Sequence, residues 1–185
     1  MQKQNLRKFL SAANLAVFVL MATVGMFGFQ PAAQAAQINA SQVLGQLDIN
    51  GDPSFLQNRI NSGQVNNYGF SNPGSIVIDE AGHRMFVVDS NNHRVLVFNL
   101  DPNSNNLLDL NADFVLGQAN FNSGLRNGHG AFNNITAGRF SSPSGVAFNG
   151  SGAQKILYVS DQNNSRVLAF DVTGNIENGE PAVEV

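Results

Sequence analysis

The chain repeats one ten-residue phrase, and this repeat limits what it can fold into. Asp89–Phe98 reads DSNNHRVLVF and Asp161–Phe170 reads DQNNSRVLAF, with seven identical positions at an offset of 72 residues. A second phrase, VLGQ, recurs at the same offset, at Val43–Gln46 and at Val115–Gln118. Self-similarity at a fixed period is typical of repeat architectures, in which each copy is one structural unit.

Each copy predicts four short strands. The expected strands are Ser75–Asp79, Met85–Asp89, Arg94–Leu100 and Asp113–Gly117 in the first copy, and Gly145–Asn149, Ile156–Ser160, Arg166–Val172 and one that starts at Ala182 in the second. Glycine and asparagine mark the turns between them. Runs such as VLVF are apolar on both alternating faces, which predicts strands buried on both sides. The offset changes from 70 to 72 residues within the second copy, which predicts a two-residue insertion near residues 153–155.

Two long polar segments separate these units. Residues 48–69 and 119–139 are rich in Asn and Gly, and each is followed by a Phe-Ser-x-Pro phrase. Loops of this length are uncommon inside compact domains and are often functional. Any ligand would be expected to contact these loops first, but we favour the interpretation that they only connect the repeated units.

The N-terminus has the layout of a secretory signal peptide. Lys3, Arg7 and Lys8 precede an uncharged apolar run at residues 9–29, and Ala33-Gln34-Ala35 follows it. The alternative is an uncleaved membrane anchor, because a run of this length can span a bilayer. We expect residues 1–35 to be removed and the protein to be secreted, periplasmic or extracellular.

The charge that remains after residue 35 excludes one class of partner. The three basic residues of the leader are removed with no acidic ones, which leaves 7 Lys and Arg against 13 Asp and Glu, a net charge of −6. Nucleic-acid binding needs a basic surface, so we expect no nucleic-acid partner. The chain has no Cys, which excludes disulfides and cysteine-based zinc sites.

At the repeated residues the chain resembles the NHL-repeat proteins, in particular an exported bacterial branch of that family. The family phrase is Pro-x-Gly, then aromatic-Val-x-Asp, then Asn-x-Arg-Val and an apolar strand. The second copy carries it at 143–147, 158–161 and 164–167; the first carries it at 86–89 and 92–95, but its Gly74 comes one place early after Pro73. The resemblance implies a β-propeller and leaves the function open, because the family contains binding scaffolds, sensor domains, RNA-binding domains and enzymes.

The expected architecture is therefore all-β: an NHL-type β-propeller with about two four-stranded blades in an incomplete ring. The expected division is a signal peptide (1–35), a single VLGQ strand with a long loop (36–69), a first blade (70–118), an inserted loop (119–139) and a second blade cut off at its fourth strand (140–185). Propellers need about four to eight blades to close. We expect either that the sequence is a fragment of a longer protein or that several copies self-associate into a ring.

The repeated polar residues are the most prominent candidates for a site. They are Asp89, Asn92 and Arg94 in the first copy and Asp161, Asn164 and Arg166 in the second. They could form a repeated ligand site. We favour a structural role, in which Asp and Asn hold the turn between two strands and the Arg pairs with the Asp. Every blade needs that turn, whereas a single ligand would need only one such set of residues.

The sequence predicts no catalytic, cofactor-binding or metal-binding residue. His83, His93 and His129 form no zinc motif and are expected to be turn or surface residues. The segment Asp48–Asp52 resembles the start of a calcium loop, but Pro53 and Arg59 stand where that loop needs Gly and Glu.

The expected function is a binding or interaction scaffold for a protein, peptide or glycan. The alternative is a metal-dependent enzyme of the gluconolactonase or lyase kind, with a divalent metal in the central channel, which needs inward-facing carboxylates at strand starts. Asp79 is such a residue, but Asn149 takes its place in the second copy. This favours binding over catalysis. A third possibility is a receptor sensor domain, for which residues 9–29 would have to remain as the membrane anchor.

Overall fold

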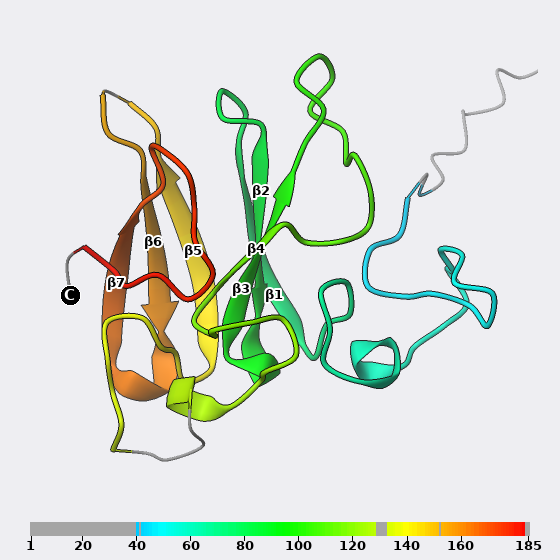
Figure 1. The fold of residues 1–185 in the computed structure, drawn as a ribbon, viewed down its shortest axis with the longest axis horizontal. Helices are drawn as coiled ribbons and strands as arrows, with labels where there is room; N and C mark the ends of the chain where they lie inside the picture. Colours follow the sequence, from blue (N-terminus) through cyan, green and yellow to red (C-terminus); the bar gives the residue numbers. More distant parts are fainter. Residues whose placement is uncertain (1–39, 41, 129–132, 152, 184–185) are drawn as a thin grey trace, which may run out of the picture. The chain divides into compact units, whose positions relative to one another are not determined.

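Two antiparallel sheets make up the computed structural model, which describes residues 40, 42–128, 133–151 and 153–183 (Figure 1). The first sheet has the order β1-β2-β3-β4 and the second the order β5-β6-β7. The strands are β1 (Pro73–Asp79), β2 (Arg84–Asp89), β3 (Arg94–Asn99), β4 (Phe114–Leu116), β5 (Pro143–Asn149), β6 (Ile156–Asp161) and β7 (Arg166–Asp171). No α-helix occurs among these residues, so the predicted all-β class is confirmed. The predicted signal peptide and His129 lie outside the described residues.

Four short 3-10 helices connect the strands. They are η1 (Ile60–Gly63), η2 (Ser90–Asn92), η3 (Arg126–Gly128) and η4 (Gln162–Asn164). The helices η2 and η4 occupy the same turn in the two sheets, where Asp89 pairs with Arg94 and Asp161 pairs with Arg166. The predicted insertion is also confirmed, because Asp79 pairs with Arg84 across the first hairpin whereas Asn149 pairs with Ile156 across the second.

Two predicted strands are wrong or incomplete. Val43–Gln46 is irregular, and β1 is the first strand of the described chain. A strand needs a partner for its backbone groups; Val115 finds one in β3, but no strand in the described part of the chain pairs with Val43. The predicted fourth strand of the second sheet is also absent from Ala182-Val183, although Val183 N–H donates to Ala169 O at 2.7 Å.

The main core lies between the two sheets. Phe86, Val88, Val95, Val97 and Leu116 from the first sheet form one cluster with residues of the second sheet and its flanking segments, Phe140, Leu157, Val159, Leu168, Phe170, Val172 and Ile176. The Phe86 and Phe148 rings stack across this contact with their centroids 6.5 Å apart. The two sheets therefore pack face to face, which buries one apolar side of each.

A second core covers the other face of the first sheet. It contains Phe70, Val87, Leu96, Phe98, Ala112 and Val115, with Leu44, Met85, Leu107 and Phe121 packed against it. Leu44 belongs to the first VLGQ phrase, so this phrase packs on the first sheet although it is not a strand.

Candidate functional site

The first polar set forms a buried network around Asp89. The Asp89 and Arg94 side chains are fully buried, and Arg94 Nε lies 2.8 Å from Asp89 Oδ2. Asn92 Nδ2 donates to the same oxygen at 2.7 Å, and Ser71 N–H donates to Oδ1 at 2.7 Å. Arg94 also donates to Gly69 O at 3.0 Å. The carboxylate and the guanidinium are thus engaged by the chain itself, as the structural interpretation predicts.

The second set repeats this geometry. Arg166 Nε lies 2.9 Å from Asp161 Oδ2, and Asn164 Nδ2 donates to the same oxygen at 2.8 Å. Ser141 N–H donates to Asp161 Oδ1 at 2.6 Å, and Arg166 donates to Arg139 O at 2.8 Å. Because both copies make the same contacts within their own sheet, the sets hold the turn and the preceding loop rather than a ligand.

Each network also contains an asparagine from a long loop. Asn92 donates to Asn61 Oδ1 at 2.6 Å, and Asn164 donates to Asn127 Oδ1 at 2.9 Å. The N–H groups of Asn61 and Asn127 donate to Phe70 O and Phe140 O, each at 2.8 Å. Both asparagines are buried and have positive φ values of 54° and 51°, a conformation that Asn tolerates better than most residues. The two loops are therefore fixed to the sheets at one matching point.

The two described histidines are turn residues, as predicted. His83 and His93 both have positive φ, 52° and 54°. His83 Nδ1 lies 2.7 Å from Asn105 Oδ1, and Ser142 N–H donates to His93 Nδ1 at 2.9 Å. Burial lowers the pKa of His93, the Arg126 charge lowers it further and the Asp161 charge opposes both.

The Asp48–Asp52 segment closes on itself as a turn. Asp48 Oδ1 accepts hydrogen bonds from Asn50 N–H at 2.8 Å and Asp52 N–H at 3.0 Å. The hydrogen bond from the Asp52 backbone is the largest cause of a lowered Asp48 pKa. Within the part of the chain that the structure describes, no three His, Cys, Asp or Glu side chains are grouped as metal ligands.

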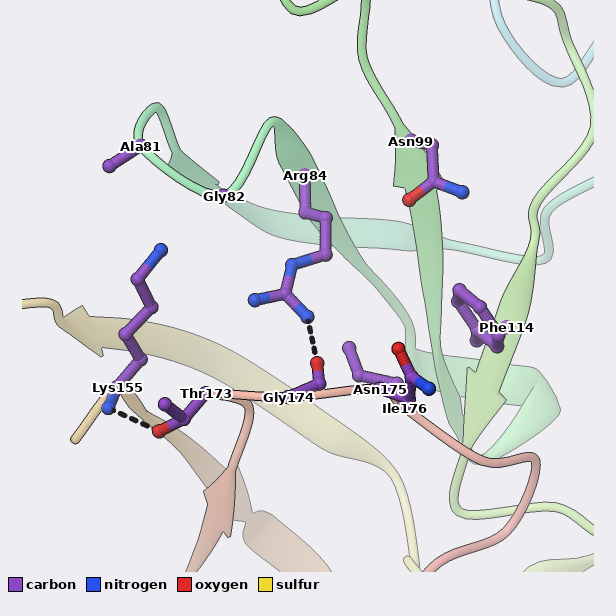
Figure 2. A pocket seen from close by; sticks show the side chains of 10 residues that line it. All are labelled: Ala81, Gly82, Arg84, Asn99, Phe114, Lys155, Thr173, Gly174, Asn175 and Ile176. Atoms are coloured by element: carbon purple, nitrogen blue, oxygen red, sulfur yellow. Dashed lines mark hydrogen bonds between the residues drawn. The ribbon is translucent and has the colours of Figure 1, made fainter. Parts of the chain in front are cut away.

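A pocket of about 510 Å³ lies where the β1–β2 turn meets the segment that follows β7 (Figure 2). Its lining is mostly polar and consists of Ala81, Gly82, Arg84, Asn99, Phe114, Lys155, Thr173, Gly174, Asn175 and Ile176. None of these residues was predicted as a site residue, but Asp79, which the sequence did bring forward, contacts three of them: Gly82, Arg84 and Lys155.

Asp79 joins the two positive charges of the pocket. Its side chain is 1% exposed; Oδ1 lies 3.0 Å from Lys155 Nζ and Oδ2 lies 3.1 Å from Arg84 Nη2. Burial by itself raises the pKa of Asp79, but hydrogen bonds from Lys155, Gly82 N–H and Arg84 outweigh it and hold the pKa below its ordinary value. Asp79 is therefore ionised at neutral pH and balances one of the two cations.

Arg84 links the first sheet to the segment after β7. Its Nη1 donates to Gly174 O at 3.1 Å (Figure 2). Its Nη2 donates to Val172 O. Lys155 N–H donates to Thr173 Oγ1 at 2.8 Å. Arg84 Nε is buried without a hydrogen-bond partner in the described structure. The pocket thus combines a net positive charge with several backbone and side-chain hydrogen-bonding groups.

The signal for this pocket in the sequence is the failure of the repeat. Strand register places Asn149 at the position of Asp79 and Ile156 at the position of Arg84. Lys155 lies in the longer hairpin of the second copy. Residues that do not repeat are free of the shared structural role, so they are the better candidates for a specific one.

One comparison with known proteins identifies the repeat. Residues 70–98, which contain β1, β2 and most of β3, match the NHL repeat family. The chain therefore carries an NHL repeat. No curated protein and no solved structure is significantly similar to the chain. In the described residues, no helix has the length and apolarity needed to cross a membrane.

Proposed function

We propose that the chain is part of an exported NHL-type β-propeller that serves as an interaction scaffold for a protein, peptide or glycan partner. The NHL match and two antiparallel sheets packed face to face support the propeller. Export is supported by the basic, apolar and Ala-Gln-Ala parts of the first 35 residues.

The pocket between the β1–β2 turn and the segment after β7 is the observation that carries this proposal. Its volume of about 510 Å³ is within the range of roughly 300–1,000 Å³ typical of ligand sites. It does not repeat between the copies, whereas the Asp89 and Asp161 networks do. Its polar lining suits a partner that supplies hydrogen bonds rather than a large apolar group.

The charge of the pocket indicates which partner groups fit. Lys155 and Arg84 are the two charged residues of the pocket lining, so an oxygen acceptor is favoured there. The Lys155 side chain is 20% exposed, so it can reach a bound group while it contacts Asp79. The carboxylate or carbonyl of a peptide and the oxygens of a glycan share this chemistry. We favour a polypeptide, because its backbone carbonyls and acidic side chains offer these acceptors in series.

Selection of displayed random peptides on the purified protein, followed by a glycan array, tests the proposal. Lys155→Gln removes the more exposed cation, and Arg59→Gln removes an exposed cation outside the pocket. Peptides selected on the wild type should bind Lys155→Gln at least tenfold more weakly, about 1.4 kcal/mol, and bind Arg59→Gln unchanged.

Lys155 also provides a direct readout, because it is the sole lysine after residue 35. A bound peptide should protect Lys155 from acetylation by an amine-reactive reagent. Selected peptides that bind both variants equally and leave Lys155 reactive would contradict the pocket as the binding site. Lys155→Gln should be less stable than the wild type because Asp79 loses one of its two cations, and a cooperative thermal transition above the assay temperature shows that the variant is folded.

A further inference from the structure

The internal contact between the two sheets uses two different faces. We call the face of the first sheet toward the second its leading face, formed by Val77, Phe86, Val88, Val95 and Val97. We call the face of the second sheet toward the first its trailing face, formed by Val146, Phe148, Leu157, Val159, Leu168 and Phe170. Because the sequence repeats, each sheet has a leading and a trailing face at equivalent positions.

The leading face of the second sheet is mostly apolar and is exposed at Tyr158 and Val167. The positions equivalent to those of the first sheet are Ala147, Tyr158, Ser160, Val167 and Ala169. Phe86 and Val95 are fully buried in the first sheet, whereas their equivalents Tyr158 and Val167 are 40% and 55% exposed. Two shallow hollows, of about 270 and 260 Å³, lie on this face, and Tyr158 lines both.

The trailing face of the first sheet is exposed along β1. Ile76 and Ile78 are 58% and 44% exposed, whereas their equivalents Val146 and Phe148 pack against the main core. The described chain therefore exposes the leading face of the second sheet and the β1 part of the trailing face of the first, which correspond to the two sides of the internal contact; Val87, Leu96 and Phe98 of that trailing face are already covered by the second core.

The first VLGQ phrase completes this correspondence. Gly117 follows β4 with a φ of 90° and lies against the Phe140 ring; Gly45 has a φ of 93° and lies against the Phe70 ring. Val43–Gln46 thus packs on the trailing face of the first sheet. The end of β4 takes the equivalent place on the trailing face of the second sheet. In the described part of the chain β7 pairs with β6 alone. No described strand lies on its other side, where β4 lies beside β3 in the first sheet.

We propose that the leading face of the second sheet binds the trailing face of the first sheet of a second copy, with that copy's Val43–Gln46 lying beside β7. The contact is head-to-tail and repeats the internal one, so it can close into a ring. With the two sheets that the described residues of each copy form, two to four copies give the roughly four to eight blades of a closed propeller. This assembly is independent of what the pocket binds, because the pocket lies in the internal contact.

Charge introduction on the two exposed faces tests the proposal in the full chain, processed as the cell processes it. Tyr158 and Ile78 are equivalent to Phe86 and Phe148, whose rings stack, so they should meet between copies. We expect the wild type to have the mass of two to four copies by light scattering. Tyr158→Lys alone and Ile78→Glu alone should each reduce the mass to that of one copy.

Mixing the two variants separates lost assembly from lost folding. In the mixture the ammonium introduced by Tyr158→Lys faces the carboxylate introduced by Ile78→Glu, and the other contacts are those of the wild type. The large species should therefore return, whereas misfolded chains would not reassemble. Leu108→Lys and Leu56→Glu, at positions 59% and 94% exposed outside both faces, should leave the mass unchanged. A wild type that is monomeric at every concentration would overturn the proposal. The leading face of the second sheet would then bind a blade of another protein.

Crosslinking tests the direction of the contact. The chain has no Cys, so Ile78→Cys and Tyr158→Cys introduce single thiols for a short bismaleimide. A mixture should crosslink the two variants to each other and neither to itself. Efficient crosslinking of Ile78→Cys to itself would show a two-fold contact and contradict the head-to-tail assembly.

Discussion

Asn164 donates a hydrogen bond to Asn127 Oδ1 at 2.9 Å, across 37 residues of sequence. The first copy makes the same contact from Asn92 to Asn61. These contacts connect each long loop to the Asp-Asn-Arg network of the sheet that follows it. The loops are thus built into the repeat, and the site that differs between the copies is the pocket at Arg84 and Lys155.

Replacing Asn61 should destabilise the protein in two separable ways. Asn61→Gly keeps the positive φ but loses the buried side-chain hydrogen bond, at a cost of about 1–2 kcal/mol in the free energy of unfolding. Asn61→Ala should cost about 1 kcal/mol more, because a Cβ without a polar group disfavours positive φ. Urea unfolding at one fixed protein concentration measures both. An alanine variant as stable as the wild type would show that the loop is not fixed at Asn61.

The two Arg–Asp pairs should differ in their contribution to stability. The Arg94 side chain is fully buried, whereas that of Arg166 is 16% exposed. Arg94→Gln leaves the Asp89 charge buried and should cost about 3–5 kcal/mol. Arg166→Gln should cost less, because water reaches that site. The same unfolding measurement compares them, and an equal or larger loss for Arg166→Gln would be evidence against the burial argument.

Gly117 should tolerate no side chain. A Cβ there would overlap the Phe140 ring, and the φ of 90° is itself unfavourable for alanine. Gly51 has a similar φ of 88° with open space around it, and Gly174 has neither constraint. We expect Gly117→Ala to cost about 2–4 kcal/mol, Gly51→Ala about 1, and Gly174→Ala close to none. Thermal melting of the three variants gives the order; equal melting temperatures for Gly117→Ala and Gly51→Ala would refute the contact with Phe140.

His93 should make stability fall on mild acidification. Its folded pKa lies below the ordinary value of 6.5, chiefly because of burial. The unfolded chain therefore binds more protons as pH falls through 6.5, and stability decreases until the pH reaches the folded pKa. Protonation at Nδ1 also removes the acceptor for Ser142 N–H. His93→Asn, which tolerates positive φ, should flatten the stability profile between neutral pH and the folded pKa; an unchanged profile would assign the effect to other groups.

The sequence predicted the strands well because they carry the repeat. Short continuous apolar runs and the turn phrase locate β2, β3, β6 and β7 to within a residue or two. The strand predicted at Val43–Gln46 was wrong. Its sequence is identical to that at the end of β4, but β3 does not lie beside it. Strand pairing is a tertiary property, and identical letters form a strand only where a partner strand is in place.

The pocket and the loop asparagines could not be predicted from the sequence, for different reasons. Asn61 and Asn127 are 66 residues apart, outside the offsets of 70 and 72, and they stand in dissimilar loops. Arg84 is the cross-strand partner of Asp79 within the first hairpin, whereas Lys155 belongs to the second copy and reaches Asp79 only because the two sheets pack together. Repeated residues can be recognised in the sequence, whereas this pocket is formed by residues that do not repeat.

A double-mutant cycle between Phe86 and Phe148 most directly tests whether the two sheets pack face to face as neighbouring blades. Their ring centroids lie 6.5 Å apart across the contact. Phe86→Leu, Phe148→Leu and the double variant, unfolded in urea at one protein concentration, should give a coupling energy of about 0.5–1.5 kcal/mol. Effects that add to within about 0.3 kcal/mol would show that the rings do not touch and would contradict the arrangement on which the scaffold, the pocket and the assembly all rest.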